Sequence, residues 1–209
     1  GVVLTHRGAV SAVYSWIMAR LMAPLVADPP PPLPEPDQAL PPSFLVVTPL
    51  FHVTALQSNF LQGLASGATL TLMYKWDPEE AVRLINEQRI TRFTGVPTQS
   101  AELMDAARRL GASLDTLEAI GGGGAKRPAA QVGELAQAFP GAAIASGWGM
   151  TETTAVATMG TLPTASRNWR RRSATPCSPN RARACLASTS RWWTRAALFC
   201  RAMAPRRVN

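Results

Sequence analysis

Apolar residues along most of the chain follow two spacings in turn, one typical of helices and one typical of buried strands. Helical spacing and helix-start signals predict helices at 9–26, 54–66, 77–88, 98–111 and 128–139. Short apolar runs between them predict strands at 43–48, 68–74, 91–96, 116–122 and 142–147. Regular alternation with short connections predicts an α/β fold, in which helices cover the faces of parallel strands.

Local end signals support two of these helices. Asp77 stands where an N-cap is expected, and Pro78 takes the first helical position, where its missing N–H costs nothing. Glu79 and Glu80 suit the positive end of the helix dipole. Gly111 follows the helix at 98–111 and is expected to be its C-cap.

Charge and cysteine divide the chain into two unlike parts. Residues 1–163 carry ten of the 21 basic residues and all 13 acidic ones, whereas residues 164–209 carry the other eleven basic residues and no acid. The overall net charge of +8 therefore describes neither part. The three cysteines lie in the basic part, far from both histidines and without zinc-site spacing, so no cysteine metal site is expected: Cys177, Cys185, Cys200.

No signal peptide is recognisable at the start of the chain. The longest apolar segment, residues 8–27, is interrupted by Arg20 and is too short on either side of it to span a bilayer. The proline-rich segment Asp28–Asp37 favours an extended linker. We therefore expect a soluble, cytoplasmic body.

Ligands of parallel α/β sheets collect at the carboxyl ends of the strands, so the loops that leave the strands are the candidate sites. The first such loop, IGGGGAKR, follows a strand that we expect to end at Ile120. Its glycines would let a flat or anionic ligand approach the backbone closely. A merely flexible loop explains the same residues.

The segment SGWGMTETTA follows the last predicted strand. The indole of Trp148 can stack on a base, the hydroxyl of Thr151 can bond a phosphate oxygen, and the carboxylate of Glu152 can hold Mg²⁺. Alternatively, Trp148 belongs to the core, and Thr151 and Glu152 simply start a helix.

A third loop, TPLFHVTAL, also leaves a strand. Phe51 and His52 could line an apolar pocket there, although a lone histidine is more often a structural hydrogen-bonding residue.

Five segments occur in order along the chain: GVVLTHRG, PLFHV, GVPT, IGGGGA and GWGMTET. In sequence and spacing they resemble the adenylate-forming acyl-CoA synthetases, a superfamily that also includes aryl-CoA ligases, luciferases and peptide-synthetase adenylation domains. The resemblance covers residues 1–162 and implies part of the large N-terminal, AMP-binding domain of such a ligase.

The resemblance implies roles for the residues of these motifs. A glycine-rich wall would face the adenine, with an aromatic residue beside it where the family usually has tyrosine: Gly122, Gly123, Gly124, Ala125, Trp148, Gly149. Thr151 would contact the phosphate, and Glu152 would bind Mg²⁺. His52 would flank the acyl pocket and the tunnel in which the thioester forms. Three further residues would lie near the acyl group: Val96, Pro97, Gly147.

The family reaction joins a carboxylate to ATP, releases pyrophosphate and passes the acyl group from the adenylate to CoA. The resemblance therefore implies ATP or AMP, Mg²⁺ and CoA as cofactors. The first step of the family reaction needs charge neutralisation on the phosphate oxygens of ATP. Members that activate amino acids place an Asp near PLFHV, and its absence here favours a carboxylate with an apolar chain, such as a fatty acid.

Several family features are not found in these 209 residues. The chain begins where the motif PKG normally ends, so the loop that grips the ATP phosphates is missing. The ribose-binding Asp, the hinge and the catalytic Lys of the C-terminal domain are missing too, and Ala125 stands where proline is usual. We expect a truncated ligase that is inactive alone.

Three interpretations compete for the basic part, residues 163–209. It is a disordered tail, a nucleic-acid-binding tail, or the product of a shifted reading frame. Because Trp has the single codon TGG and Thr codons begin with AC, reading one base over turns Trp192–Trp193 into valine and Trp193–Thr194 into aspartate. The residues before them alternate apolar and polar in that frame, as in a half-buried strand.

We therefore expect a frame break between 161 and 168, with nucleic acid not a partner. Two alternatives remain open. One is a non-catalytic nucleotide-binding remnant with a basic, nucleic-acid-binding or disordered tail. The other is a chain that does not fold stably, because exposed sheet edges favour aggregation.

Overall fold

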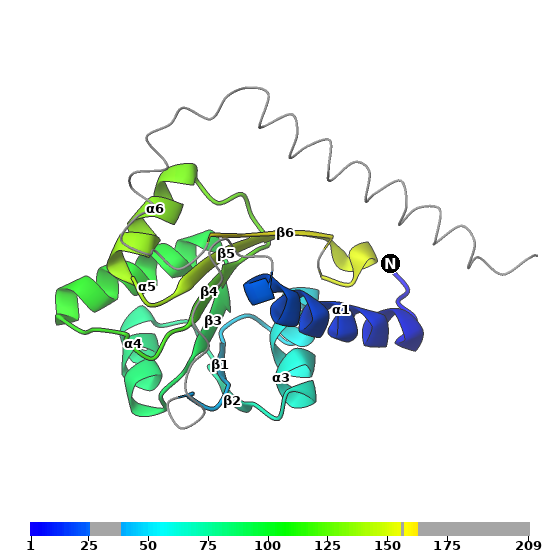
Figure 1. Cartoon of the computed structure of the whole chain (residues 1–209), viewed down its shortest axis with the longest axis horizontal. Coiled ribbons are helices and arrows are strands. Elements are labelled where there is room, and N and C mark those ends of the chain that lie inside the picture. Colours follow the sequence, from blue (N-terminus) through cyan, green and yellow to red (C-terminus); the bar gives the residue numbers. More distant parts are fainter. Residues whose placement is uncertain (26–38, 156, 163–209) are drawn as a thin grey trace, which may run out of the picture. The chain divides into compact units, whose positions relative to one another are not determined.

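The computed structural model describes residues 1–25, 39–155 and 157–162. These residues belong to one compact unit, Gly1–Ala165, built around a six-stranded sheet of order β2-β1-β3-β4-β5-β6 (Figure 1). The linker prediction at 28–37 and the tail predictions at 163–209 fall outside the described residues. The strands are β1 (Ser43–Val46), β2 (Thr69–Leu72), β3 (Arg92–Gly95), β4 (Ala119–Gly122), β5 (Ala143–Trp148) and β6 (Thr158–Leu162).

The first five strands are parallel, which confirms the predicted α/β fold. β6 differs, because it returns beside β5 in the antiparallel direction, with Gly147 opposite Met159. The sequence prediction has no strand there. A tight turn at 151–155, with Thr154 and Ala155 at positive φ, reverses the chain and makes this pairing possible.

One face of the sheet is covered by α4 (Pro78–Glu87), α5 (Pro97–Leu110) and α6 (Ala129–Ala138) (Figure 1). The core lies here. Three strand residues that point to this face are almost fully buried: Phe93, Ile120, Ile144. They pack against apolar residues of the three helices, including Ile85, Leu103, Leu135. Burial of this apolar area is the main stabilising contribution of the fold.

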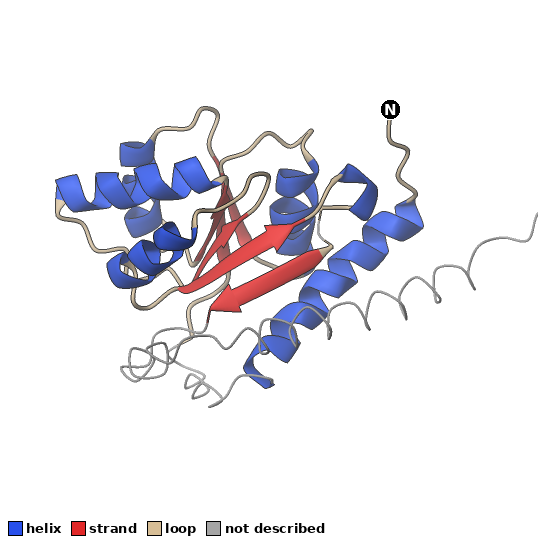
Figure 2. Cartoon of the chain, turned by 90° about the horizontal axis from the view of Figure 1, so that it is seen from above, coloured by secondary structure: helices blue, strands red, loops and turns tan. Residues whose placement is uncertain are grey.

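The opposite face carries α1 (His6–Leu25) and a second helical run, which Figure 2 shows from above. This run consists of α2 (Val53–Ala55), the π-helix η1 (Leu56–Leu61) and α3 (Gln62–Ala65). The sequence predicts one α-helix at 54–66, and the structure interrupts it with π geometry. Gln57 and Asn59 of η1 are buried polar residues, each with side-chain atoms that lack a hydrogen-bond partner within the described residues.

The capping predictions are confirmed. Asp77 accepts hydrogen bonds from the amides of Glu79 and Glu80 at 2.9 and 3.1 Å, and Gly111 ends α5 in the left-handed conformation at φ 59°. α1 begins earlier than the apolar pattern indicates, because the hydroxyl of Thr5 accepts a hydrogen bond from Gly8 N–H at 3.1 Å and so caps the helix.

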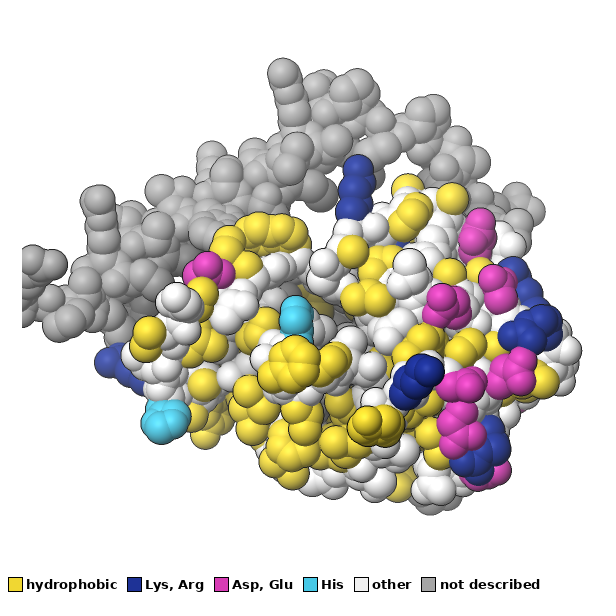
Figure 3. All heavy atoms as spheres, turned by 180° about the vertical axis from the view of Figure 1, so that it is seen from behind, with side chains coloured by type: hydrophobic (Ala, Val, Ile, Leu, Met, Phe, Trp, Pro, Cys, Tyr) yellow, Lys and Arg dark blue, Asp and Glu magenta, His cyan; other side chains and the backbone are white. Residues whose placement is uncertain are grey.

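On the face that Figure 3 shows, most of the charged side chains gather on the side of α4 and α5, and more apolar side chains appear on the rest of that face. Arg83 bridges Glu80 and Glu87 along α4, and Arg109 of α5 reaches Glu79 at 2.5 Å. In the part of the chain that the structure describes, no helix is long and apolar enough to cross a membrane.

Candidate functional site

Small residues line the sheet face that lies opposite the core. Side chains alternate along a strand, so residues two positions apart share a face. On this face the register aligns Arg92 with Ala119 and Ala143, and the next row aligns Thr94 with Gly121 and Ala145. Apart from Arg92, none of these side chains is large. These side chains do not fill the space between the sheet and the helices above it, and a cavity remains between the layers.

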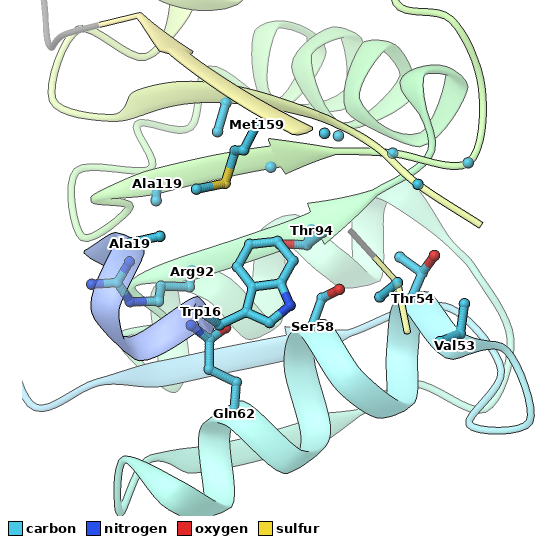
Figure 4. Close-up of a pocket in the computed structure, with 18 of the residues that line it drawn as sticks. Trp16, Ala19, Val53, Thr54, Ser58, Gln62, Arg92, Thr94, Ala119 and Met159 are labelled. Carbon is cyan, nitrogen blue, oxygen red and sulfur yellow. The ribbon is translucent and has the colours of Figure 1, made fainter. Parts of the chain in front are cut away.

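That space is a cavity of about 680 Å³. Its size is within the usual range for pockets that bind small molecules. Figure 4 shows residues from both layers facing it, with the indole of Trp16 from α1 standing between the helical run and β3. Several residues of the predicted site also line it: His52, Gly122, Gly123, Gly124, Gly147, Gly149, Thr151, Glu152. The structure thus brings together motifs far apart in sequence.

The glycine-rich segment is partly strand and partly loop. β4 ends at Gly122, as does the strand predicted at 116–122, so the first two glycines of IGGGGAKR belong to the strand and not to the loop after Ile120. A Cβ on Gly122 would come within 1.9 Å of the Arg127 guanidinium, and a Cβ on Gly121 would come within 2.7 Å of the Thr94 hydroxyl. Gly124 has φ 77°, which favours glycine. Packing at Gly121 and Gly122 and the backbone conformation at Gly124 therefore favour glycine, whether or not a ligand binds.

The segment after β5 forms the short 3₁₀-helix η2 (Thr151–Thr153). Thr151 and Glu152 are exposed and line the cavity at the carboxyl end of β5. Trp148 is 55% exposed, so the interpretation of this residue as core is wrong. Trp148 and Ala125 are not among the residues that line the cavity, and their place beside the adenine stays a prediction.

His52 has a structural hydrogen bond as well as a place at the cavity. Its Nδ1 accepts a hydrogen bond from Thr54 N–H at 3.2 Å and so caps α2. An Nδ1 that accepts leaves the proton on Nε2, and that nitrogen is then a donor. Phe51, beside it, is 92% exposed and does not line the cavity.

The residues of GVPT lie behind the glycine loop rather than in the cavity wall. Val96 Cγ1 lies 3.5 Å from where a Cβ of Gly124 would be. Pro97 is buried at the start of α5, and its carbonyl accepts a hydrogen bond from Gln131 at 2.7 Å. Of the residues predicted near the acyl group, Gly147 alone lines the cavity.

The end of the cavity beside the carboxyl ends of the parallel strands has groups that fit a nucleotide and a magnesium ion. Mg²⁺ is commonly held by one or two carboxylates together with substrate phosphates, so a single carboxylate at Glu152 is compatible with it. No group of three or more potential metal-ligating side chains occurs in the described residues. Bound ATP with Mg²⁺ would supply the activating phosphate, and Thr151 would donate to its oxygens.

The end of the cavity beside the amino ends of the parallel strands contains functional candidates that sequence analysis misses, namely Trp16, Ser58, Gln62 and Arg92. Burial lowers the pKa of Arg92, Glu118 opposes this effect, and nearby Arg20 adds to it. Arg92 carries the one detectable signal, a charged residue in a strand that is otherwise buried. The other three residues belong to helices whose orientation is decided by tertiary packing.

The sequence profile of the AMP-binding enzymes matches residues 1–186, beyond residue 162, where we expect the resemblance to end. A 4-coumarate–CoA ligase-like protein of Oryza sativa is 36% identical over 121 residues, which are 56% of this chain and 20% of the relative. A feruloyl-CoA synthase of an Amycolatopsis species is 36% identical over 110 residues, which are 52% and 22% of the two chains. The chain thus spans about a fifth of the length of the curated relatives it matches.

Solved structures show the same fold. A fatty acyl-CoA synthetase of Mycobacterium tuberculosis superposes with a TM-score of 0.61 at 24% identity, over 77% of this chain and 28% of the other. An o-succinylbenzoate coenzyme A synthetase of Bacillus subtilis, in complex with ATP and magnesium ion, gives a TM-score of 0.56 at 21% identity, over 74% and 28%. With its profile match, its curated relatives and this fold, the chain belongs to the family of AMP-binding enzymes.

Proposed function

We propose that this chain forms the acid-binding surface and part of the nucleotide-binding surface of an ATP-dependent carboxylate–CoA ligase. One observation carries the proposal: a single cavity connects the small-residue face of the sheet with the glycine loop and the Thr151–Glu152 turn. An acid lying along the sheet would present its carboxylate beside the site for the adenylate. Holding the two reactants in line in this way is a large part of catalysis by proximity.

The substrate class is part of the proposal. Small side chains at Ala119, Gly121 and Ala145 leave an uncharged space along the sheet, which suits an alkyl chain of the fatty-acid type. The names of two relatives specify 4-coumarate and feruloyl acids, which are also carboxylic acids with an apolar body. The cytoplasmic location expected from the sequence stays a prediction.

The chain's own residues have distinct parts in this proposal. The Thr151 hydroxyl donates to a phosphate oxygen, the Glu152 carboxylate accepts the metal, and the Nε2–H of His52 donates toward the acyl carboxylate. The backbone of Gly123 and Gly124 approaches the adenine without intervening side chains. CoA transfer is proposed for the longer polypeptides of the family, of which this chain matches a part.

A substitution that partly fills the cavity tests the proposal. Ala145 lines the cavity, so Ala145→Leu should overpack it and weaken binding of a decanoyl sulfamoyl-adenosine probe about tenfold, as measured by calorimetry. Ala130→Leu adds the same volume to an exposed position on α6 and should leave the affinity unchanged. Both variants must unfold cooperatively. Absence of binding by the folded parent chain, or equal binding by the two variants, would contradict the proposal.

A further inference from the structure

The end of the cavity farthest from the glycine loop has an excess of positive charge. Arg92 at the start of β3 and Arg20 of α1 both line it, together with Glu118, which immediately precedes β4. Nη2 of Arg92 lies 3.5 Å from Oε2 of Glu118. Arg20 has no carboxylate within ion-pair distance among the described residues. Among the described residues, two cations face one carboxylate at this end of the cavity, so one positive charge is left unbalanced there.

Arg92 is held in place, but its hydrogen-bonding capacity is not used up. Its guanidinium carbon lies 5.9 Å from the centroid of the Phe44 ring, and 24% of its side chain is exposed. Its Nε is buried and donates to no acceptor within the described part of the chain. A buried donor without an acceptor costs free energy, and a ligand that supplied the acceptor would recover it.

A second buried donor lies in the same cavity. Nε1 of Trp16 has no acceptor among the described residues. Figure 4 labels Ser58 and Gln62 of the helical run, which line the same cavity as Trp16 and Arg92. Tryptophan and arginine side chains only donate hydrogen bonds, so the group that satisfies both is an acceptor. With the unbalanced positive charge, the best-suited acceptor is an anion.

The strand register gives the distance between the two ends of the cavity. Arg92, Ala119 and Ala143 form one row across the sheet, and Gly147 lies four residues further along β5. Four residues of strand extend about 13 Å. The small residues in between offer no charged partner, so this stretch suits methylene groups.

We propose that the cavity takes an elongated dicarboxylate, a fatty acid whose far end carries a second carboxylate bound by Arg92 and Trp16. This inference rests on the proposed function, because it assigns the first carboxylate to the reacting end beside the glycine loop. A planar guanidinium and a carboxylate match in geometry, and such charge-assisted hydrogen bonds are the strong ones. Arg20 adds long-range attraction.

Calorimetry on the full 209-residue chain tests the inference with three probes, namely decanedioate, its monomethyl ester and decanoate. Decanedioate should bind about tenfold tighter than the other two, because they lack the second charge. Octanedioate and dodecanedioate then identify the length that fits best. Arg92→Met should abolish the preference for decanedioate over its monomethyl ester.

Two further variants keep the test decisive if Arg92→Met does not fold. Arg20→Gln should weaken decanedioate binding severalfold, whereas Arg108→Gln, on the exposed side of α5, should not change it. Equal affinity of the folded parent chain for decanedioate and its monomethyl ester would overturn the inference, and so would equal effects of Arg20→Gln and Arg108→Gln. The sulfamoyl-adenosine probe separates the two proposals, because its binding without this preference would leave the proposed function standing.

Discussion

At the scale of single residues, glycine has different functions at different positions. The missing Cβ of Gly122 leaves room for the guanidinium of Arg127, which donates to Ser100 and Gln131 at 3.3 Å each. Burial lowers the pKa of Arg127, and its guanidinium packs where a Cβ of Gly122 would lie. At Gly111 the reason is the backbone itself, since the left-handed conformation disfavours any residue with a Cβ.

A pair of alanine substitutions tests the effect of the backbone conformation. Gly111→Ala should lower the free energy of unfolding by about 1 kcal/mol, because φ is 59° there although nothing lies within 4 Å of the new Cβ. Gly133 lies within α6, and its Cβ would likewise have nothing within 4 Å, so Gly133→Ala should raise the free energy of unfolding by about 0.5–1 kcal/mol. Urea unfolding measures both. Changes of the same sign would contradict this account of the backbone.

At the scale of elements, helix ends are specified locally. Asp77 satisfies two otherwise unpaired amides of α4, so Asp77→Ala should cost about 0.5–2 kcal/mol of unfolding free energy. Asp105→Ala, in the middle of α5, removes only an exposed ion pair of 3.7 Å and should cost less than about 1 kcal/mol. Thermal unfolding compares the two variants, and equal losses would refute a capping role for Asp77.

The same distinction between local and long-range interactions explains what the sequence could predict. The α4 and α5 boundaries follow from Asp77 and Gly111, whose hydrogen bonds and backbone angles involve near neighbours. β6 exists only through its pairing with β5, and the segment TMGTL has little strand character of its own. The π geometry of η1 likewise has no signal in the spacing of apolar residues. Motif resemblance placed the carboxyl end of the site, whereas Trp16 and Arg92 come together only through the fold.

At the scale of the whole molecule, the cavity has two ends of opposite character. The cationic side chains that line it in the described residues, Arg20 and Arg92, belong to the amino end of the sheet. Thr151 and Glu152, where phosphates are proposed to bind, have no lysine or arginine among the described lining residues beside them. Phosphoryl chemistry requires charge neutralisation at its oxygens, and a hydroxyl with one carboxylate-bound metal supplies part of it.

We therefore expect this chain to bind an adenylate analogue without catalysing adenylation. We expect the 209-residue protein to bind the sulfamoyl-adenosine probe but to give no detectable ATP–pyrophosphate exchange with any acid, because a cationic donor for the transferred phosphate is absent from the described site. A full-length relative assayed in parallel controls for the reagents. Exchange by this chain, lost in Glu152→Gln, would show that the described site suffices for adenylation.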